Sequence, residues 1–252
     1  MTTTYFTSPE GRRLAYRASA PTHSPLTYVW LSGFKSDMSG TKVTELEAWA
    51  TEAGHGFLAF DYSGLGLSDG AFEDGTISAW REDALAAIDT HSTGPIVLVG
   101  SSMGGWMALL AALARPDRVA GLVLIAPAPD FTEKLMWPEF SAEAQSEIME
   151  QGFTQRPSDY DEPYTITRAL IEDGQTWQIL DAPIELDIPV RILQGMQDAD
   201  VPWKHAERLV DTITSEDLVF TLIKDGDHRL SREQDIARLK TTCAEIATAT
   251  RP

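Results

Sequence analysis

The sequence IVLVGSSMGG, residues Ile96–Gly105, is the most informative part of the chain. Its first four residues are apolar and mostly β-branched, which predicts a buried strand, and the residues that follow have the apolar spacing of a helix. Between them lies the pattern G-x-S-x-G, in which a strained strand-to-helix turn exposes a serine hydroxyl at the edge of a sheet. The register of the pattern selects Ser102 rather than Ser101 as a nucleophile. The alternative is a turn of small residues with no chemistry.

On both sides of this stretch, short apolar runs alternate with longer segments of helical spacing. The runs that predict buried strands are Leu26–Leu31, Phe57–Phe60, Ile96–Val99, Val119–Ile125, Val190–Leu193 and Leu218–Ile223. The segments that predict helices are Thr41–Ala53, Ser78–Ser92, Met103–Arg115, Trp203–Thr214 and Ser231–Ala247. Strands that alternate with helices predict an α/β fold, with a mostly parallel sheet and helices on both faces.

Two segments break this alternation. Residues 1–20 predict an antiparallel pair of strands with its turn at Gly11 and Arg12. The stretch from Pro127 to Pro189 holds about sixty residues where a short loop or one helix would suffice. Because an insertion at the end of a parallel strand lies over the edge where ligands bind, we interpret it as a cap. The expected domains are an α/β core of residues 1–127 and 187–252 and a cap of residues 128–186, with helices over Ala142–Gln151 and Thr165–Asp173.

A serine hydroxyl is a poor nucleophile at neutral pH and needs a base. His228 follows the last predicted strand, which places it at the same edge of the sheet as Ser102. The chain order nucleophile, acid, histidine also requires an acid between the two, and only His228 leaves room for one. Surface or helix-capping roles are expected for the other histidines, His23, His55, His91 and His205.

The acid is expected on the loop after the strand before last. Asp198 and Asp200 both lie there, and the register of the loop favours Asp198, with Asp200 as a surface or capping residue. A buried carboxylate at this place would orient the imidazole and stabilise the imidazolium. Asp225 and Asp227 lie too near His228 in the sequence to reach behind its ring, so they are predicted to be turn residues.

Two backbone amides are expected to bind an oxyanion. One is the N–H of Met103, at a helix N-terminus whose dipole favours negative charge. The other is the N–H of Phe34, in the loop after the first parallel strand, where Gly33 lets the backbone turn toward the site. The next residue, Lys35, is either a surface charge or a substrate-binding residue.

The composition argues against several classes of protein. A formal net charge of −18, without clustered Lys and Arg, argues against nucleic-acid binding and favours a solvated surface. The single cysteine, Cys243, cannot form an internal disulfide and is expected to pack within a helix. The N-terminus lacks a secretory signal, and the longest apolar run, Val119–Ala128, is too short to span a membrane. We therefore expect a cytoplasmic protein with no membrane span, and the oligomeric state stays open.

Several motifs together resemble one branch of the α/β-hydrolase superfamily. They are Gly33–Lys42, Asp61–Gly70 (DYSGLGLSDG), Gly100–Gly105 with Trp106, Gly195–Asp198 with Val201–Trp203, and Asp227–Arg229. This branch contains the mitochondrial palmitoyl-protein thioesterase, also known as mycophenolic acid acyl-glucuronide esterase, and its bacterial relatives. The similarity extends from about residue 10 to the C-terminus and is thinnest across the predicted cap. It does not extend to a mitochondrial transit peptide, so the location of the animal members is not expected to carry over.

The resemblance implies a triad of Ser102, Asp198 and His228, no cofactor and no metal. It also implies hydrolysis of carboxylic esters or thioesters with bulky acyl groups, including acyl-protein thioesters and acyl glucuronides. A C–C bond hydrolase or lyase on the same triad, or a non-catalytic ligand-binding homologue, are the alternatives, because motifs do not fix the reaction. The aromatic residues of the predicted cap would either line an acyl pocket or pack the cap onto the core. They are Trp137, Phe140, Phe153, Tyr160, Tyr164 and Trp177.

Overall fold

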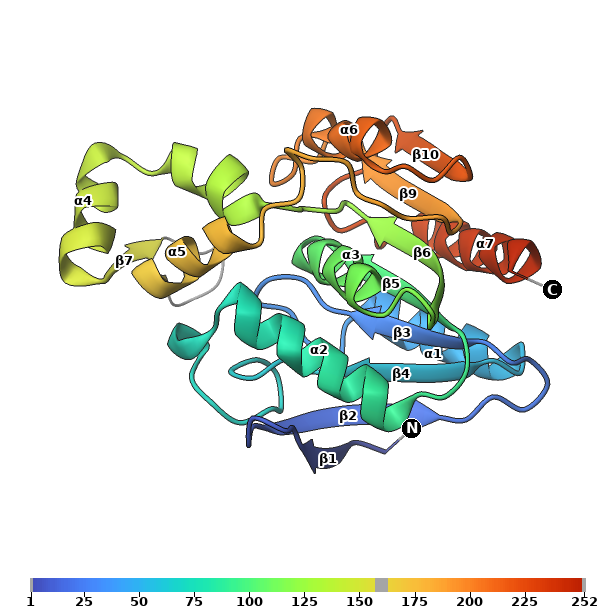
Figure 1. Ribbon diagram of the computed structural model, residues 1–252. Coiled ribbons are helices and arrows are strands. Elements are labelled where there is room, and N and C mark those ends of the chain that lie inside the picture. The colour runs from blue at the N-terminus through green and yellow to red at the C-terminus, as the bar shows by residue number, and fades with distance from the viewer. Residues whose placement is uncertain (1, 157–162, 251–252) are drawn as a thin grey trace.

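Eight strands form one sheet in the computed structural model, which describes residues 2–156 and 163–250 (Figure 1). In spatial order they are β1 (Thr4–Thr7), β2 (Arg13–Ser19), β4 (Gly56–Phe60), β3 (Thr27–Leu31), β5 (Ile96–Ser101), β6 (Val119–Ile125), β9 (Val190–Gly195) and β10 (Leu218–Ile223). The last six of these run parallel, while β1 and β2 pair antiparallel at one edge around a turn that contains Gly11, with φ +82°. The α/β class and the N-terminal strand pair predicted from the sequence are confirmed.

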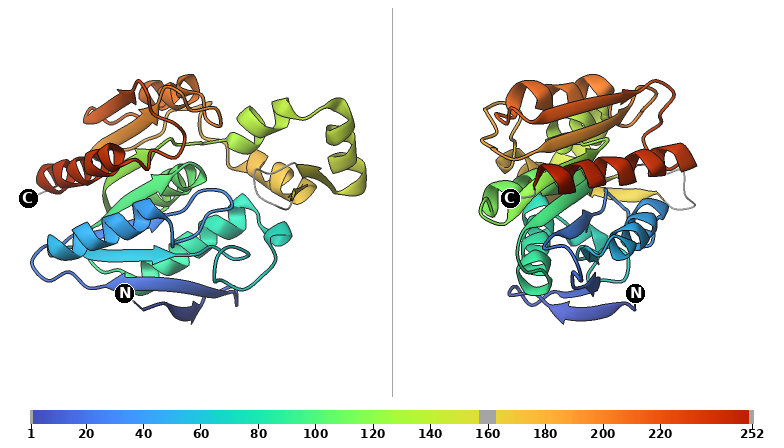
Figure 2. Two further views of the ribbon diagram at one scale, coloured as in Figure 1. Left: turned by 180° about the vertical axis from the view of Figure 1, so that it is seen from behind. Right: turned by 90° about the vertical axis from the view of Figure 1, so that its right-hand side faces the viewer.

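The long helices cover both faces of the sheet. They are α1 (Thr41–Glu52), α2 (Ile77–His91), α3 (Met103–Ala114), α6 (Trp203–Thr212) and α7 (Glu233–Ala249), and a short helix η1 (Phe72–Asp74) precedes α2. Figure 1 shows α2 and α3 in front of the sheet, and Figure 2 shows α1 and α7 on the opposite face. No helix within the described ranges is both long enough and apolar enough to cross a membrane.

Each central strand contributes to two apolar cores. In β5, Leu98 packs into the core beneath α2 and α3, whereas Val97 and Val99 pack into the core beneath α1 and α7. This is the reason that the strand sequences are continuously apolar rather than alternating. Cys243 in α7 is fully buried in the second of these cores, as expected, and burial raises the pKa of its thiol.

The direction in which the sheet grows changes between β3 and β5. β4 lies on one side of β3, whereas β5, β6 and β9 follow on the other. At such a switch point the loops after two neighbouring strands diverge and leave a crevice at the carboxyl ends. Phe34 follows β3 and Ser102 follows β5, so the fold places both residues at this crevice.

Residues 128–156 and 163–186, here called the insertion, extend beyond the carboxyl end of β6 (Figure 1). The insertion contains η2 (Thr132–Met136), η3 (Trp137–Glu139), α4 (Ala142–Gln151), the antiparallel pair β7 (Phe153–Arg156) and β8 (Tyr164–Thr167), and α5 (Arg168–Thr176). The helix predicted over Ala142–Gln151 is confirmed. The helix predicted over Thr165–Asp173 is wrong at its start, because the β-branched Thr165–Thr167 pair with β7 and the helix begins at Arg168.

Two carboxylates fix the insertion in place. The carboxylate of Asp173 in α5 accepts hydrogen bonds from the amide and the hydroxyl of Ser78 in α2, at 2.7 and 2.6 Å. At the base of the insertion, the buried Asp130 accepts from the amides of Ile179 and Leu180, at 2.9 and 3.0 Å. The first carboxylate joins the insertion to a core helix, and the second joins its two ends.

Candidate active site

Ser102 lies at the turn between β5 and α3 and has φ 56° and ψ −119°. A non-glycine residue with positive φ is strained and persists only where its surroundings fix it. Here the Ser102 amide donates to the carbonyl of Ile125, at 2.9 Å, and the Ser102 carbonyl accepts from the amides of Gly105 and Ala128, at 2.8 and 3.1 Å. These bonds join the turn to both the first turn of α3 and the chain around the end of β6.

The turn is packed so closely that side chains at its flanking glycines would overlap backbone atoms. A Cβ on Gly100 would overlap the carbonyl of Gly104, and a Cβ on Gly104 would overlap the carbonyl of Leu31 at the end of β3. A Cβ on Gly33 would lie 3.4 Å from the Cβ of Ser102. The loop after β3 therefore lies directly against the serine.

His228 and Asp198 are in contact at the same edge of the sheet. The Nδ1 atom of His228 lies 2.9 Å from Oδ2 of Asp198, whose side chain is fully buried. Oδ2 also accepts from the side chain of Gln194, and Oδ1 accepts from the amides of Asp200 and Val201. A carboxylate with acceptor roles at both oxygens makes Nδ1 of His228 the donor, so Nε2 is left to accept a proton.

The three acidic competitors of Asp198 have other contacts. Asp225 forms an ion pair with Arg232, at 2.7 Å, and Asp227 accepts from the amide of Leu230, at 2.9 Å, as expected of turn residues. Asp200 lines the cavity described below. Asp198, Asp200 and His228 offer ligand atoms within 4.8 Å of one another, which is a spacing that a metal ion could use. Because hydrogen bonds already engage both oxygens of Asp198, the contacts fit a carboxylate–imidazole pair better than a metal site.

Both amides expected to bind an oxyanion border Ser102. Met103 is the first residue of α3, and the first amides of a helix have no partner within it. The Phe34 amide follows Gly33, and across the part of the chain that the structure describes it donates to no other protein group. Asp61 holds this loop through a hydrogen bond from the Met38 amide, at 2.7 Å, and burial raises the pKa of Asp61.

A cavity of about 820 Å³ lies over Ser102 and His228. Its walls come from the loop after β3, the turn after β5, the loops after β9 and β10, and the insertion. Ser102 and the His228 ring both line it, although the structure as described places no hydrogen bond between them. In enzymes without substrate such bonds are often long and shorten only when substrate binds.

The apolar part of this lining combines residues named in the sequence analysis with three that it did not single out. Phe34 and Tyr164 contribute, together with Phe131, Leu135 and Met136 in and before η2. These last three residues recur at helical spacing in the segment that follows β6, a strand whose carboxyl end lies at the same edge of the sheet as Ser102. That combination of spacing and position is the signal that could have found them.

The aromatic residues predicted in the cap lie in different environments. Of the six, Tyr164 lines the cavity, while Trp137, Phe140 and Trp177 are partly buried against the core cluster. Phe153 is 45% exposed and faces solvent. Tyr160 lies outside the described residues.

Among the remaining histidines, three differ from the surface or capping role that was expected. His55 packs against the rings of Tyr28 and Trp49, with centroids 5.1 and 5.5 Å away. His205 is buried because its ring lies between α6 and the chain after β6, with Nε2 2.8 Å from the carbonyl oxygen of Pro129, and burial lowers its pKa. His91 ends α2 and stacks on Tyr16, with ring centroids 3.7 Å apart. All three side chains therefore contribute to packing rather than to the site.

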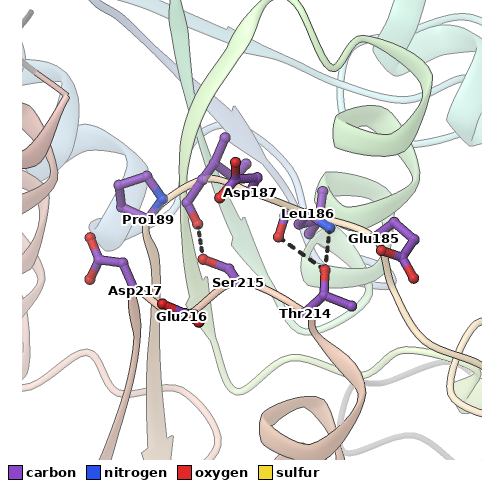
Figure 3. A pocket seen from close by; sticks show the side chains of 9 residues that line it. Glu185, Leu186, Asp187, Pro189, Thr214, Ser215, Glu216 and Asp217 are labelled. Atoms are coloured by element: carbon purple, nitrogen blue, oxygen red, sulfur yellow. Dashed lines mark hydrogen bonds between the residues drawn. The ribbon is translucent and has the colours of Figure 1, made fainter.

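A second cavity of about 610 Å³ lies at the opposite, amino-terminal ends of β9 and β10 (Figure 3). Its hydroxyl groups are engaged with backbone, since Ser215 donates to the carbonyl of Ile188, at 2.7 Å, and Thr214 accepts from the amide of Leu186, at 3.0 Å. The remaining polar lining is acidic. With no nucleophile–base pair among its lining residues, this cavity has none of the chemistry present around Ser102.

Comparison with known proteins agrees with this geometry. The profile of the alpha/beta hydrolase family matches residues 24–240, from just before β3 into α7. The chain belongs to the alpha/beta hydrolase family. Human palmitoyl-protein thioesterase ABHD10, a mitochondrial protein, is 37% identical over 220 residues, which cover 86% of this chain and 72% of the relative. The resemblance stated from the motifs is therefore confirmed, and the chain is a hydrolase.

Two solved structures share the whole architecture. A crystal structure of a protein from Agrobacterium vitis S4 is 44% identical, with a TM-score of 0.93 and 98% of each chain covered. The alpha/beta hydrolase domain-containing protein 10 from mouse is 34% identical, with a TM-score of 0.89, and the match covers 98% of this chain and 99% of the mouse chain. The likeness includes the insertion, which the motif comparison covered least.

The same comparison overturns one expectation. A cytoplasmic protein was expected from the sequence, but the palmitoyl-protein thioesterase relatives from cattle, orangutan, human, mouse and rat are all named as mitochondrial. The prediction was wrong because it rested on the lack of a recognisable secretory signal and of a membrane-spanning run, and neither feature distinguishes the cytoplasm from the aqueous interior of an organelle.

Proposed function

We propose that this hydrolase is a serine esterase and thioesterase, with Ser102 as nucleophile, His228 as base and Asp198 as the carboxylate that orients it. One observation carries the proposal. The strained Ser102 and the Asp198-paired His228 come from three different strand ends, and Ser102 and His228 line one cavity. A strained backbone and a buried carboxylate–imidazole pair both have costs that packing alone does not explain.

The contacts support a definite sequence of proton and bond movements. Ser102 Oγ attacks the carbonyl carbon while Nε2 of His228 takes the hydroxyl proton, since Nδ1 is held by Asp198. The amides of Phe34 and Met103 donate to the oxyanion of the tetrahedral intermediate. The imidazolium then protonates the departing alcohol or thiol, and an acyl group remains on Ser102. Water, deprotonated by His228, releases the acid and restores the serine.

The test is turnover of a simple ester by matched serine variants. Ser102→Ala should lower kcat by at least about 10⁴-fold, because the serine nucleophile and its base, His228, act as a unit. Ser101→Ala is the matched control, as it removes the neighbouring hydroxyl, and it should retain most of the rate. Equal losses in the two variants would contradict the assignment.

We also propose that the insertion acts as a cap over the site and selects bulky acyl groups. The apolar side chains of Phe131, Leu135 and Met136 support this, because they line the cavity that contains Ser102. An apolar pocket gains about 0.8 kcal/mol for each methylene group that it buries. Four more methylene groups would then raise kcat/KM by roughly two orders of magnitude, provided that diffusion does not limit the reaction.

Measurement of kcat/KM for acyl esters from acetyl to palmitoyl tests this selectivity. Phe131→Ala and Met136→Ala should flatten the dependence on chain length, while acetyl-ester turnover stays within a few fold. Phe153→Ala is the matched control, because this aromatic residue of the same insertion faces solvent. An optimum at the acetyl ester in the unaltered enzyme would contradict the proposal.

The leaving group is proposed to be a thiol or an alcohol, with acyl-protein thioesters first among candidates because the human, bovine and murine relatives are named palmitoyl-protein thioesterases. Acyl glucuronides stay a second candidate from the motif resemblance. A panel with one acyl group on a thiol, a simple alcohol and a glucuronic acid would rank them by kcat/KM. Equal kcat values for all three would mean that deacylation limits kcat, and burst kinetics would then be used to compare acylation.

A further inference from the structure

Lys35 has a position that the proposed mechanism does not use. It follows Phe34 in the loop after β3, and it has φ 53°, which is strained for a lysine. Its ammonium lies 4.2 Å from the ring centroid of Phe72 in η1 and 5.2 Å from that of Tyr164 in β8. The side chain is therefore held between a core loop and the insertion, at the wall of the cavity that contains Ser102.

The other charges around the cavity are mostly engaged with protein groups. Arg156 forms an ion pair with Glu139, at 2.8 Å. The Lys42 ammonium donates a hydrogen bond to the backbone carbonyl of Arg229. The carboxylate of Asp37 accepts from both the amide and the hydroxyl of its neighbour Ser39.

Lys35 differs from these cations. Among the described residues it forms no ion pair and no hydrogen bond, and its contacts are with two aromatic rings. Lys35 is exposed, and within residues 2–156 and 163–250 it has no acidic partner, although the chain has 38 acidic residues against 20 lysines and arginines. Aromatic faces attract a cation without neutralising its charge, which leaves the ammonium available to an anion in the cavity.

We propose that Lys35 binds a negatively charged group of the substrate, such as a carboxylate, at a distance from the ester bond. This inference rests on the proposed esterase function and names a substrate class for the same site. An anion held at Lys35 would orient the ester relative to Ser102, and uncharged esters of the same size would lack that contact. The anion belongs either to the acyl part or to the leaving group, and the two sources are separable by experiment.

The experiment uses two pairs of esters that differ only in charge. In one pair the leaving group is 4-hydroxybenzoate or 4-hydroxybenzamide on an octanoyl ester. In the other, a phenyl ester carries an acyl chain that ends in a carboxylate or a carboxamide. The quantity measured is the ratio of kcat/KM for the charged and uncharged members, compared between enzymes so that the intrinsic reactivity of each ester cancels.

In one of the two pairs, Lys35→Met should lower this ratio by about tenfold, the effect expected of a charge-assisted hydrogen bond that is partly exposed. Lys35→Arg should keep most of the preference, and 0.5 M KCl should reduce the preference of the unaltered enzyme but not of Lys35→Met. The matched control is Lys204→Met, because Lys204 also lies over an aromatic ring, 3.9 Å from the centroid of Trp203, but does not line this cavity.

Two results would overturn the proposal. One is a ratio that is the same in the unaltered enzyme and in Lys35→Met for both pairs. The other is a fall in kcat/KM that is equal for charged and uncharged esters, which would make Lys35 a residue that only supports the loop of Phe34. Failure of the esterase function itself is distinguishable, because the uncharged esters would then show no turnover that depends on Ser102.

Discussion

The turn of residues 100–105 and the insertion of residues 128–156 and 163–186 both border the candidate active site, but they are held in place by different means. Backbone contacts fix the turn: Ser102 bonds to Ile125, Gly105 and Ala128, and Gly104 lies against the carbonyl of Leu31. The insertion is joined to the core through side chains, by hydrogen bonds such as those between Asp173 of α5 and Ser78 of α2 and by apolar residues such as Phe131 that lie in the core cluster. From this difference we infer that the core backbone determines the reactivity of the site, whereas side chains of the insertion determine which acyl groups it accepts.

The largest expected effect lies on the core side of this comparison. Asp198→Asn should lower kcat by about 10⁴-fold, because the imidazole would lose the acceptor that holds Nδ1 as a donor. Asp200→Asn should stay within a few fold, since Asp200 contacts Asp198 through its amide. Steady-state kinetics on one ester decide between the two aspartates, and the reverse ranking would refute the assignment.

A methyl group added to each region compares their tolerance. Gly104→Ala should lower the free energy of unfolding by about 3 kcal/mol or more and abolish activity, because its Cβ would overlap the Leu31 carbonyl. Gly152→Ala, at the end of α4 in the insertion, meets no atom within 4 Å and should cost only about 1–2 kcal/mol for its left-handed backbone. Urea unfolding of both variants gives the comparison. A Gly104→Ala protein with normal stability would contradict the packing described for the turn.

The same contrast explains what could be predicted from the sequence. The strand runs, the turn at Ser102 and the contact between Asp198 and His228 follow from local patterns and from the order of strand ends, so the sequence predicts them. The lining of the cavity by Phe131 and Met136 depends on how the insertion folds back over the core. That arrangement rests on contacts between residues about fifty to one hundred positions apart, such as Asp173 with Ser78, which no local pattern encodes.

The β7–β8 pair illustrates a second limit. Thr165–Thr167 continue the apolar spacing of α5, yet they form a strand because a partner strand is present. Two β-branched threonines favour a strand once such a partner exists. Tertiary context therefore overrides a helical pattern in this short segment.

Loss of the contact between α5 and α2 should affect selectivity more than reactivity. Asp173→Ala removes two hydrogen bonds to Ser78 and should lower the free energy of unfolding by about 2 kcal/mol. The preference for long acyl chains should also weaken, while acetyl-ester turnover changes little. Glu172→Ala is the matched control, because Glu172 is exposed on the same helix and its nearest cation, on Arg168, is 3.7 Å away. Equal stability and selectivity in the two variants would argue against Asp173 as an anchor.

The smallest expected effect is a dependence of stability on pH at Lys42, which lines the cavity that contains Ser102. Burial lowers the pKa of Lys42 from its ordinary 10.5 to about 8, although Asp227 and Asp235 oppose the change. Between these values the unfolded chain binds a proton that the folded protein does not, so the free energy of unfolding rises with pH. Relative to Lys42→Met, the unaltered protein should gain about 1–2 kcal/mol between pH 8 and 9.5. A difference between the two that is constant or falls with pH would contradict the burial of a charged amine there.

Covalent labelling locates the nucleophile itself. After reaction with a fluorophosphonate, intact-mass measurement should show one adduct per chain, and fragment spectra of the peptide that contains both serines should place it on Ser102. Ser102→Ala should remain unlabelled, and Ser101→Ala should label like the unaltered protein. An adduct on Ser101 or Cys243, or full labelling of Ser102→Ala, would contradict the assignment of the strained serine after β5 as the reactive group.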